Sequence, residues 1–295
     1  MEFKPELLPT IRKLEIHAKR NVLSQTLTGN WLSKIRGHGI EFSGYRQYQP
    51  GDDASLIDWR ASIRSRKLLV KELNEEKNLN IFVMLDVSDT MLFGTTEKLK
   101  AEYAAELVSS LSFAALRSGE NVSLSMFSDK IRKFVELKQG TNSHGLLMKA
   151  LANADYYGGP KDFGKSSIQF LSLMEVPGLI ILVSDFIGLD ATWEHYLKVM
   201  AKKHDLLCIM VRDPRDRRLP EVGEYILADP STGQKLVIDA SDYAKPYYEY
   251  VLHEEESLHS LLNMAHADML LLETTDDYAS KIVHFFLIRN RKVKE

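Results

Sequence analysis

Apolar and polar residues along positions 79–213 follow two periods in turn, one typical of strands and one typical of helices. Continuous apolar runs of strand length lie at 81–85, 179–183 and 206–211, as in strands that are buried on both faces. Helical spacing follows the first run, at Leu99, Tyr103, Leu107 and Leu111. This alternation predicts an α/β fold with a doubly wound, mainly parallel sheet that helices cover on both faces.

The remaining elements extend this core along the chain. We expect further strands at 122–127, 131–137 and 269–273, helices at 146–154, 166–174, 191–203, 243–267 and 278–289, and a hairpin formed by 225–229 and 235–239. The first 78 residues contain no clean strand–helix–strand unit. We therefore expect an irregular N-terminal subdomain, 1–78, and an α/β domain, 79–295, with a C-terminal extension from about 214 that continues the same sheet.

Two aspartates, Asp86 and Asp185, stand at the carboxyl ends of core strands, where open α/β sheets bind ligands. The segment after the first strand reads Asp-x-Ser-x-Thr, so Asp86, Ser88 and Thr90 can offer one carboxylate and two hydroxyl oxygens to one point. Such an oxygen set suits Mg²⁺ or Mn²⁺, and Asp185 would add a second carboxylate. The alternative for the Asp-x-Ser-x-Thr segment alone is a helix N-cap.

The same segment resembles the metal ion-dependent adhesion site of von Willebrand factor A domains, which have Asp-x-Ser-x-Ser after their first strand. The resemblance implies a Mg²⁺ (or Mn²⁺) site made by Asp86, Ser88, Thr90 and Asp185. In that family a threonine from a second loop completes the site. A partner protein then supplies an acidic side chain to the open coordination position.

Two loops are candidates for the second-loop ligand. Thr141 has the Gly-Thr-Asn context that is usual in the family. The later loop, 158–162, has Pro160 or Lys161 at the expected hydroxyl position. Neither can serve as a neutral ligand, so the site would be incomplete or would recruit Asp162, Ser166 or Ser167. We favour the later loop and an altered site.

An enzyme of another class is the alternative. Haloacid dehalogenase-like phosphatases also have an apolar strand followed by Asp-x-Asp-x-Thr, and Asp86 would be their phosphate-accepting nucleophile beside Mg²⁺. Ser88 stands where those enzymes have the second aspartate, which is their general acid. A serine cannot protonate a leaving group at neutral pH, so phosphatase chemistry is disfavoured.

Several further motifs lie along nearly the whole chain, at 44–53, 57–62, 68–72, 184–186, 213–220 and 229–233. Together they resemble the domain-of-unknown-function 58 family, bacterial proteins with a von Willebrand factor A-like domain that are often encoded beside MoxR-type AAA+ ATPases. The resemblance implies that such an ATPase, or its client, is the partner. Its N-terminal signature contains Arg46, Tyr48, Asp52, Asp53, Asp58, Trp59 and Arg60.

This signature has two interpretations. In the first, the aspartates cap backbone amides or pair with Arg46 or Arg60, and the motif holds the subdomain together. In the second, the same residues form part of a partner-binding surface near the Asp86 segment. Both interpretations stay open at this point.

Composition narrows the functional classes. The 295 residues carry a net charge of −3, so nothing in the global charge favours nucleic acid, and the basic residues of 60–71 are followed at once by glutamates. The only cysteine, Cys208, lies in an apolar run, and no apolar stretch approaches the ~18 residues of a membrane span. The N-terminus lacks the pattern of a secretory signal, so we expect a cytoplasmic protein. The expected function is a non-enzymatic, metal-dependent protein-interaction module, an adaptor in protein assembly or in metal or cofactor insertion.

Overall fold

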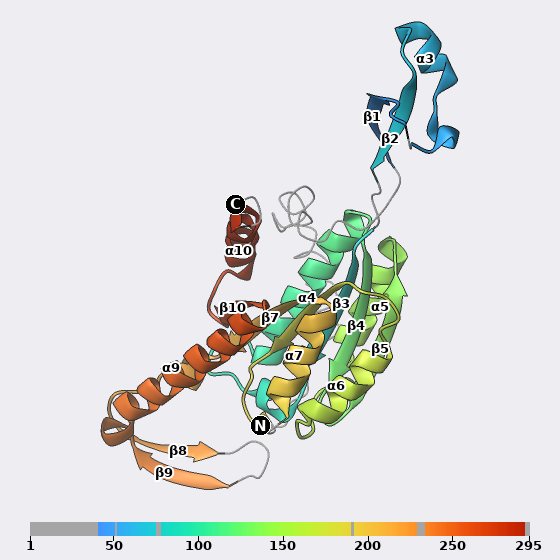
Figure 1. Ribbon diagram of the computed structural model, residues 1–295. Coiled ribbons are helices and arrows are strands. Elements are labelled where there is room, and N and C mark those ends of the chain that lie inside the picture. Colours follow the sequence, from blue (N-terminus) through green and yellow to red (C-terminus); the bar gives the residue numbers. More distant parts are fainter. Residues whose placement is uncertain (1–40, 51, 75–77, 190–191, 229–233, 293–295) are drawn as a thin grey trace. The chain divides into compact units, whose positions relative to one another are not determined.

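The computed structural model describes residues 41–50, 52–74, 78–189, 192–228 and 234–292 (Figure 1). The chain forms two compact units, one at Ile35–Leu79 and a larger one that contains Asn80–Glu295. Each unit is described here by itself.

The larger unit is built on a six-stranded sheet. Its strands have the order β10-β7-β6-β3-β4-β5, and β5 is antiparallel to β4 while all other neighbours are parallel. The bounds are β3 (Asn80–Asp86), β4 (Asn121–Phe127), β5 (Ile131–Lys138), β6 (Leu179–Ser184), β7 (Asp205–Arg212) and β10 (Asp268–Glu273). This confirms the predicted α/β fold with a mainly parallel sheet.

Helices cover both faces of this sheet (Figure 1). One face packs against α6 (Phe163–Ser172), α7 (Trp193–Lys203) and α9 (Ala240–Met264) in a single apolar cluster. On the other, α4 (Lys100–Arg117) contacts both α5 (Thr141–Leu151) and α10 (Tyr278–Lys292), the latter through edge-on packing of Tyr103 and Tyr278. Because the inner strands are covered on both sides, their residues are buried without a break, which explains the continuous apolar runs.

Only part of the C-terminal extension continues the main sheet, contrary to our expectation. β10 pairs with β7 in parallel, whereas β8 (Glu224–Ala228) and β9 (Lys235–Asp239) pair with each other in a separate antiparallel sheet. The difference follows from connectivity. A helical crossover through α9 brings β10 back parallel to the sheet, but the short connection between β8 and β9 makes them pair locally.

The smaller unit is more regular than we expected. It contains β1 (Glu41–Gln47), the short 3₁₀ helix η1 (Ala54–Leu56), α3 (Trp59–Ser65) and β2 (Leu69–Asn74). The two strands pair antiparallel, with a register irregularity between Phe42 and Gly44. Both strands mix polar and apolar residues and one has this irregularity, so no clean period marks them in the sequence.

Candidate functional site

The carboxyl ends of neighbouring strands bring the two predicted aspartates together. Leu85 of β3 is level with Val183 of β6, so Asp86 and Asp185 emerge side by side from the same edge of the sheet. Both carboxylates are completely buried. We call the edge of the sheet at which the parallel strands end the carboxyl edge. The candidate site is a buried cluster under the loops of this carboxyl edge.

The ammonium group of Lys161 lies between these carboxylates. Its Nζ is 2.7 Å from Asp86 Oδ2 and 2.7 Å from Asp185 Oδ1, and it donates a third hydrogen bond, of 2.9 Å, to the carbonyl oxygen of Ile187. The side chain is only 3% exposed. All three N–H donors of the ammonium are thus used inside the protein.

The remaining acceptor positions of Asp86 are also engaged. Oδ1 accepts hydrogen bonds from the backbone N–H of Ser88 (2.9 Å) and from its hydroxyl (2.7 Å). Oδ2 accepts from the Ser184 hydroxyl at 2.6 Å, in addition to Lys161. Thr90 reaches this group only through Ser88, with 3.2 Å between their hydroxyl oxygens. The carboxylate of Asp86 therefore accepts four hydrogen bonds, from Ser88 (two), Ser184 and Lys161, which is the full capacity of a carboxylate.

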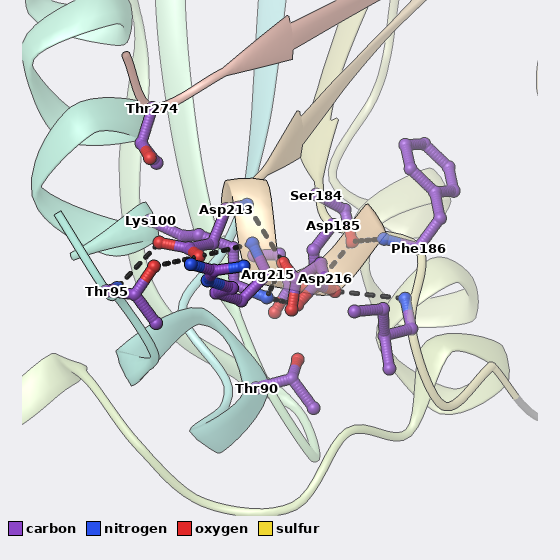
Figure 2. A network of polar contacts seen from close by, with 12 residues as sticks. Thr90, Thr95, Lys100, Ser184, Asp185, Phe186, Asp213, Arg215, Asp216 and Thr274 are labelled. Atoms are coloured by element: carbon purple, nitrogen blue, oxygen red, sulfur yellow. Dashed lines mark hydrogen bonds and ion pairs between the residues drawn. The ribbon is translucent and has the colours of Figure 1, made fainter. Parts of the chain in front are cut away.

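A second buried lysine, Lys100 at the start of α4, neutralises the other side of Asp185. Its Nζ lies 2.8 Å from Asp185 Oδ2 and 2.7 Å from Asp216 Oδ2, and its side chain is 1% exposed. Figure 2 shows Lys100, Asp185 and Asp216 converging beneath the loops. The expectation from sequence included neither Lys100 nor Asp216. A sequence signal for Lys100 did exist: it lies three positions before Tyr103 and so shares the apolar face of the helix, where a lysine is unusual.

Asp213, the first residue after β7, lies beside this cluster (Figure 2) and is also completely buried. Its carboxylate accepts hydrogen bonds from the backbone N–H (2.7 Å) and hydroxyl (2.6 Å) of Thr95. It also accepts a 2.8 Å bond from the N–H of Arg215. In the sequence, Asp213 was noted only as the first residue of the motif 213–220 and was not assigned to the site. The rule that selected Asp86 and Asp185, a carboxylate directly after a core strand, would have found it.

The loop that carries Lys161 is fastened to the loop after β3. The N–H of Gly158 donates to the carbonyl of Val87 at 2.7 Å. The N–H of Gly159 donates to Asp89 Oδ1 at 2.7 Å, and the N–H of Asp89 donates back to the Gly159 carbonyl at 2.9 Å. Both glycines have positive φ angles, 96° and 94°, which glycine adopts without strain. These bonds set the position from which Lys161 enters the cluster.

The charges of the cluster stabilise one another. Burial alone raises the pKa of Asp185, but Lys161 and Lys100 outweigh it and hold the pKa of this carboxyl well below its usual range. Burial alone lowers the pKa of Lys161, but Asp185 and Asp86 outweigh it and the pKa is raised above the ordinary 10.5. The Lys161–Asp185 pair is therefore ionised across the physiological pH range.

None of the three second-loop candidates lies in the cluster. Thr141 opens α5 after β5, and because β5 runs antiparallel to β4, with Lys138 beside Val122, this helix begins at the opposite edge of the sheet. The carboxylate of Asp162 instead caps α6 by accepting the N–H of Lys165 at 2.8 Å. The Ser166 hydroxyl donates to the carbonyl of Ser128. The structure therefore brings none of these three residues to the cluster, and the residue of the later loop that reaches it is Lys161.

The residues of the cluster, as arranged, do not fit a divalent metal ion. An ion bound by both Asp86 and Asp185 would have to lie where the Lys161 ammonium lies, and Asp86 has no acceptor position left for it. Within the described ranges, no group of three or more His, Cys, Asp or Glu side chains could hold a metal ion. Mg²⁺ or Mn²⁺ binding stays a prediction from the sequence, and the position of Lys161 argues against it.

The alternative of a phosphatase is unsupported. Its nucleophile would be Asp86, whose side chain is completely buried, paired with Lys161 and bonded to three further donors. A carboxylate in this state cannot approach a phosphate ester in line. The helix N-cap alternative also differs from the observed geometry, because Asp86 bonds to the N–H of Ser88, and Ser88 makes no side-chain capping bond to the short 3₁₀ helix η2 (Asp89–Leu92).

In the smaller unit, the N-terminal signature makes local contacts. The guanidinium of Arg46 forms two bonds to Asp52, of 2.6 and 2.7 Å, and Asp52 also accepts the N–H of Gln49 at 2.8 Å. These bonds hold the pKa of Asp52 near 2. The motif thereby closes the turn at Pro50, as the structural interpretation expects.

Other signature residues cap the short helices of this unit. Asp53 accepts the N–H of Ser55 at the start of η1, and Asp58 accepts the N–H of Ala61 at the start of α3 and the hydroxyl of Tyr45 at 2.9 Å. The N–H of Tyr48 bonds to the carbonyl of Leu68. Four members are exposed: Arg46, Asp53, Trp59 (63%) and Arg60. The first two make the local bonds described above, which leaves Trp59 and Arg60 as an exposed pair. The exposed pair is the part of the signature that local structure does not explain.

Comparison with solved structures supports the fold. The protein BatB from Bacteroides thetaiotaomicron aligns with 73% of this chain and 100% of its own, at 13% identity and a TM-score of 0.50. At this identity the likeness concerns the fold alone. A von Willebrand factor type A domain from Catenulispora acidiphila aligns with 48% of this chain and 35% of its own, at 15% identity and a TM-score of 0.35.

The expected cytoplasmic location is contradicted, because other matched structures are those of membrane-associated proteins. They include an aerotolerance-related membrane protein from Bacteroides fragilis, with 13% identity over 73% of this chain and 100% of its own, at a TM-score of 0.46. A membrane-spanning protein from Vibrio fischeri also matches, with 16% identity over 72% of this chain and 98% of its own, at a TM-score of 0.26. Among the described helices, none is both long and apolar enough to cross a membrane.

Sequence relatives cover almost the whole chain. The uncharacterized protein Rv1480 from Mycobacterium tuberculosis is 26% identical over 97% of this chain and 91% of its own length. The uncharacterized protein MAV169 from Mycobacterium avium is 34% identical over 39% of this chain and 68% of its own. The profile of the family described as protein of unknown function DUF58 matches residues 44–257. With most of both units inside that match, this chain belongs to the DUF58 family.

Proposed function

We propose that this protein is a non-enzymatic protein-interaction module whose carboxyl edge binds a MoxR-type AAA+ ATPase or its client. The von Willebrand factor A-like fold supports an interaction module. Membership of the DUF58 family supports the ATPase, because genes of this family are often found beside those of MoxR-type ATPases.

One observation carries the proposal: the charged groups of the cluster at the carboxyl edge are paired with one another, with Lys161 and Lys100 bonded to Asp86, Asp185 and Asp216. A buried carboxylate or ammonium that already uses its partners is a poor nucleophile or general base. Such a cluster instead fixes the loops above it in one arrangement. Rigid loops lose little conformational freedom on association, which favours protein binding.

The rim of this edge presents side chains that suit a protein interface. The ring of Phe93 is 39% exposed and lies 5.5 Å from Lys100 Nζ. Thr95 and Arg215 are exposed as well, and both are held by Asp213. Aromatic and arginine side chains on a rigid support are the residues that most often dominate binding energy. We therefore place the contact with the partner on Phe93, Thr95 and Arg215.

The first test measures affinity for the MoxR-type ATPase of the same organism by calorimetry. We expect Arg215→Glu to weaken binding by about tenfold or more, because it reverses a charge within the contact. The matched control is Lys202→Glu, an equally exposed charge reversal in the last turn of α7, at the other edge of the sheet. Equal affinities for the two variants and the unmodified chain would contradict the proposed surface.

A phosphatase assay tests the alternative function, in which Asp86 is the nucleophile. The chain should not hydrolyse a generic phosphate ester in the presence of Mg²⁺. Turnover that disappears in Asp86→Asn would show that Asp86 acts as a nucleophile, and the interaction-module proposal would then fail in its non-enzymatic part.

A further inference from the structure

We propose that the ammonium group of Lys161 takes the place of the divalent metal ion in this von Willebrand factor A-like domain. The carboxyl edge would then be a metal-independent binding surface. The first statement concerns only this chain, whereas the second rests on the proposed function. Three features support the replacement: the position of Lys161, the saturation of its hydrogen-bond partners and the charge of the cluster.

The position of Lys161 is the first argument. Its Nζ lies at hydrogen-bond distance from a carboxylate on each of two neighbouring strands, Asp86 after β3 and Asp185 after β6. These are the two carboxylates that the sequence pattern assigned to an ion. The lysine comes from the loop 158–162 and is one of the two residues, with Pro160, that stand where the adhesion site of the resembling domains would have a neutral hydroxyl ligand.

Saturation of the partners is the second argument. The ammonium has three hydrogens and all three are donated, to Asp86, Asp185 and the carbonyl of Ile187. The hydroxyl of Ser88, the expected second ligand, donates to Asp86. An incoming ion would have to displace a lysine whose side chain is 3% exposed, and that lysine would lose its counter-charges.

Charge is the third argument. Lys161 and Lys100 together carry the same total charge as one divalent cation, and both are paired with Asp185. The two lysines face the three carboxylates of Asp86, Asp185 and Asp216, so a divalent ion would change the net charge of this group from −1 to +1 and would lie beside two buried ammonium groups, which is unfavourable. The two lysines therefore compensate the negative charge of the carboxylates as a divalent ion would, and their own positive charge repels such an ion.

The loop geometry shows that Lys161 is held in place. Gly158 and Gly159, three and two positions before it in the loop, bond to Val87 and Asp89 of the neighbouring loop. The backbone that carries Lys161 is thus fixed by hydrogen bonds, and the lysine side chain reaches the cluster without a rearrangement of the loop.

The test converts the lysine back into a neutral hydroxyl. Mg²⁺ and Mn²⁺ are titrated by calorimetry into the unmodified full-length chain and into Lys161→Thr, and Tm is measured with and without each ion. We expect no saturable binding to the unmodified chain at millimolar ion. For Lys161→Thr we expect a lower Tm without ion, saturable binding, and a Tm that rises by at least about 2–4 °C when the ion is added.

Two control variants separate a new site from unspecific effects. Lys161→Met removes the charge but fills the space, so its Tm should fall and neither ion should restore it. Lys165→Thr changes an exposed lysine in the same segment and should behave like the unmodified chain in both measurements.

Either of two outcomes would overturn the replacement. One is millimolar or tighter Mg²⁺ or Mn²⁺ binding by the unmodified chain that is lost in Asp86→Asn, a result that holds even if Lys161→Thr does not fold. The other is a folded Lys161→Thr that binds neither ion.

Partner binding is then compared in Mg²⁺ and in EDTA. Equal affinity supports metal independence, and a loss in EDTA contradicts it. If the ATPase binds in neither buffer, the proposed partner fails while the calorimetric result for Lys161 stands.

Discussion

At the scale of single residues, the site is defined by charges that are buried in pairs. Asp185 is the central member, because both Lys161 and Lys100 bond to it. Removing one partner of a buried ion pair leaves an uncompensated charge, and this costs far more than an exposed ion pair contributes. The residue scale therefore gives the sharpest prediction about stability.

We expect Asp185→Asn to lower the free energy of unfolding by about 3–5 kcal/mol, since it leaves two buried ammonium groups without one of their counter-charges. Urea unfolding at neutral pH, followed by circular dichroism, measures the change. Asp155→Asn, at an exposed aspartate, should alter stability by no more than about 0.5 kcal/mol. Equal losses in the two variants would show that the cluster does not depend on Asp185.

The sequence identified about half of this cluster, and the reason is visible in individual residues. Asp86 and Asp185 were found because strand ends in a parallel sheet meet at one edge. Lys161 was noted as unable to act as a neutral ligand, yet its role as a cation between the carboxylates depends on the loop path, which no local pattern determines. Lys100 and Asp216 meet Asp185 from elements far apart in the sequence.

At the scale of elements, the strands and helices of the larger unit were largely predictable, but their pairing was less so. Apolar runs marked β3, β6 and β7 to within one or two residues. The antiparallel direction of β5 was not expected, and it is the reason why Thr141 lies at the wrong edge. Strand direction follows from the length of a connection, and β4 and β5 are joined by only a few residues.

The loop between η3 (Ala154–Tyr156) and α6 deserves a test because it positions Lys161. At Gly159, φ is +94°, and an added Cβ would clash with Nη2 of Arg132, which is the end of a flexible side chain and can move away. The backbone conformation is therefore the larger obstacle. Gly159→Ala should lower the free energy of unfolding by about 1–2 kcal/mol, measured by urea unfolding.

Gly145→Ala provides the matched control for this substitution. Gly145 lies inside α5, and an added Cβ would meet nothing within 4 Å. Alanine is the better helix former, so this variant should gain up to about 1 kcal/mol. If Gly159→Ala and Gly145→Ala changed the free energy of unfolding in the same direction, the backbone conformation at Gly159 would not be what makes its glycine necessary.

At the scale of the whole molecule, stability should depend on pH in a way that the buried pair dictates. The pKa of Asp185 is lower in the folded protein than its ordinary value of 3.8, so its contribution is present above that pH and is lost as the pH falls below it. The pKa of Lys161 is higher than its ordinary value of 10.5, so its contribution is present below that pH and is lost as the pH rises above it.

We therefore expect the stability difference between the unmodified chain and Asp185→Asn to be constant around neutral pH and to shrink below about pH 4. Urea midpoints of both proteins, measured from neutral pH down to about pH 3, give this difference directly. A difference that stays constant to the acid end would contradict the depressed pKa of Asp185.

Replacement of an ion by Lys161 has a consequence for control of the protein in the cell. A bound ion exchanges with its surroundings, so a site that needs one can be emptied by scarcity or by a competing chelator. A lysine is joined to its site by the chain itself and arrives with it at synthesis. The carboxyl edge is then competent from the moment the domain folds, and any switch that turns it off must come from another protein or from another part of the chain.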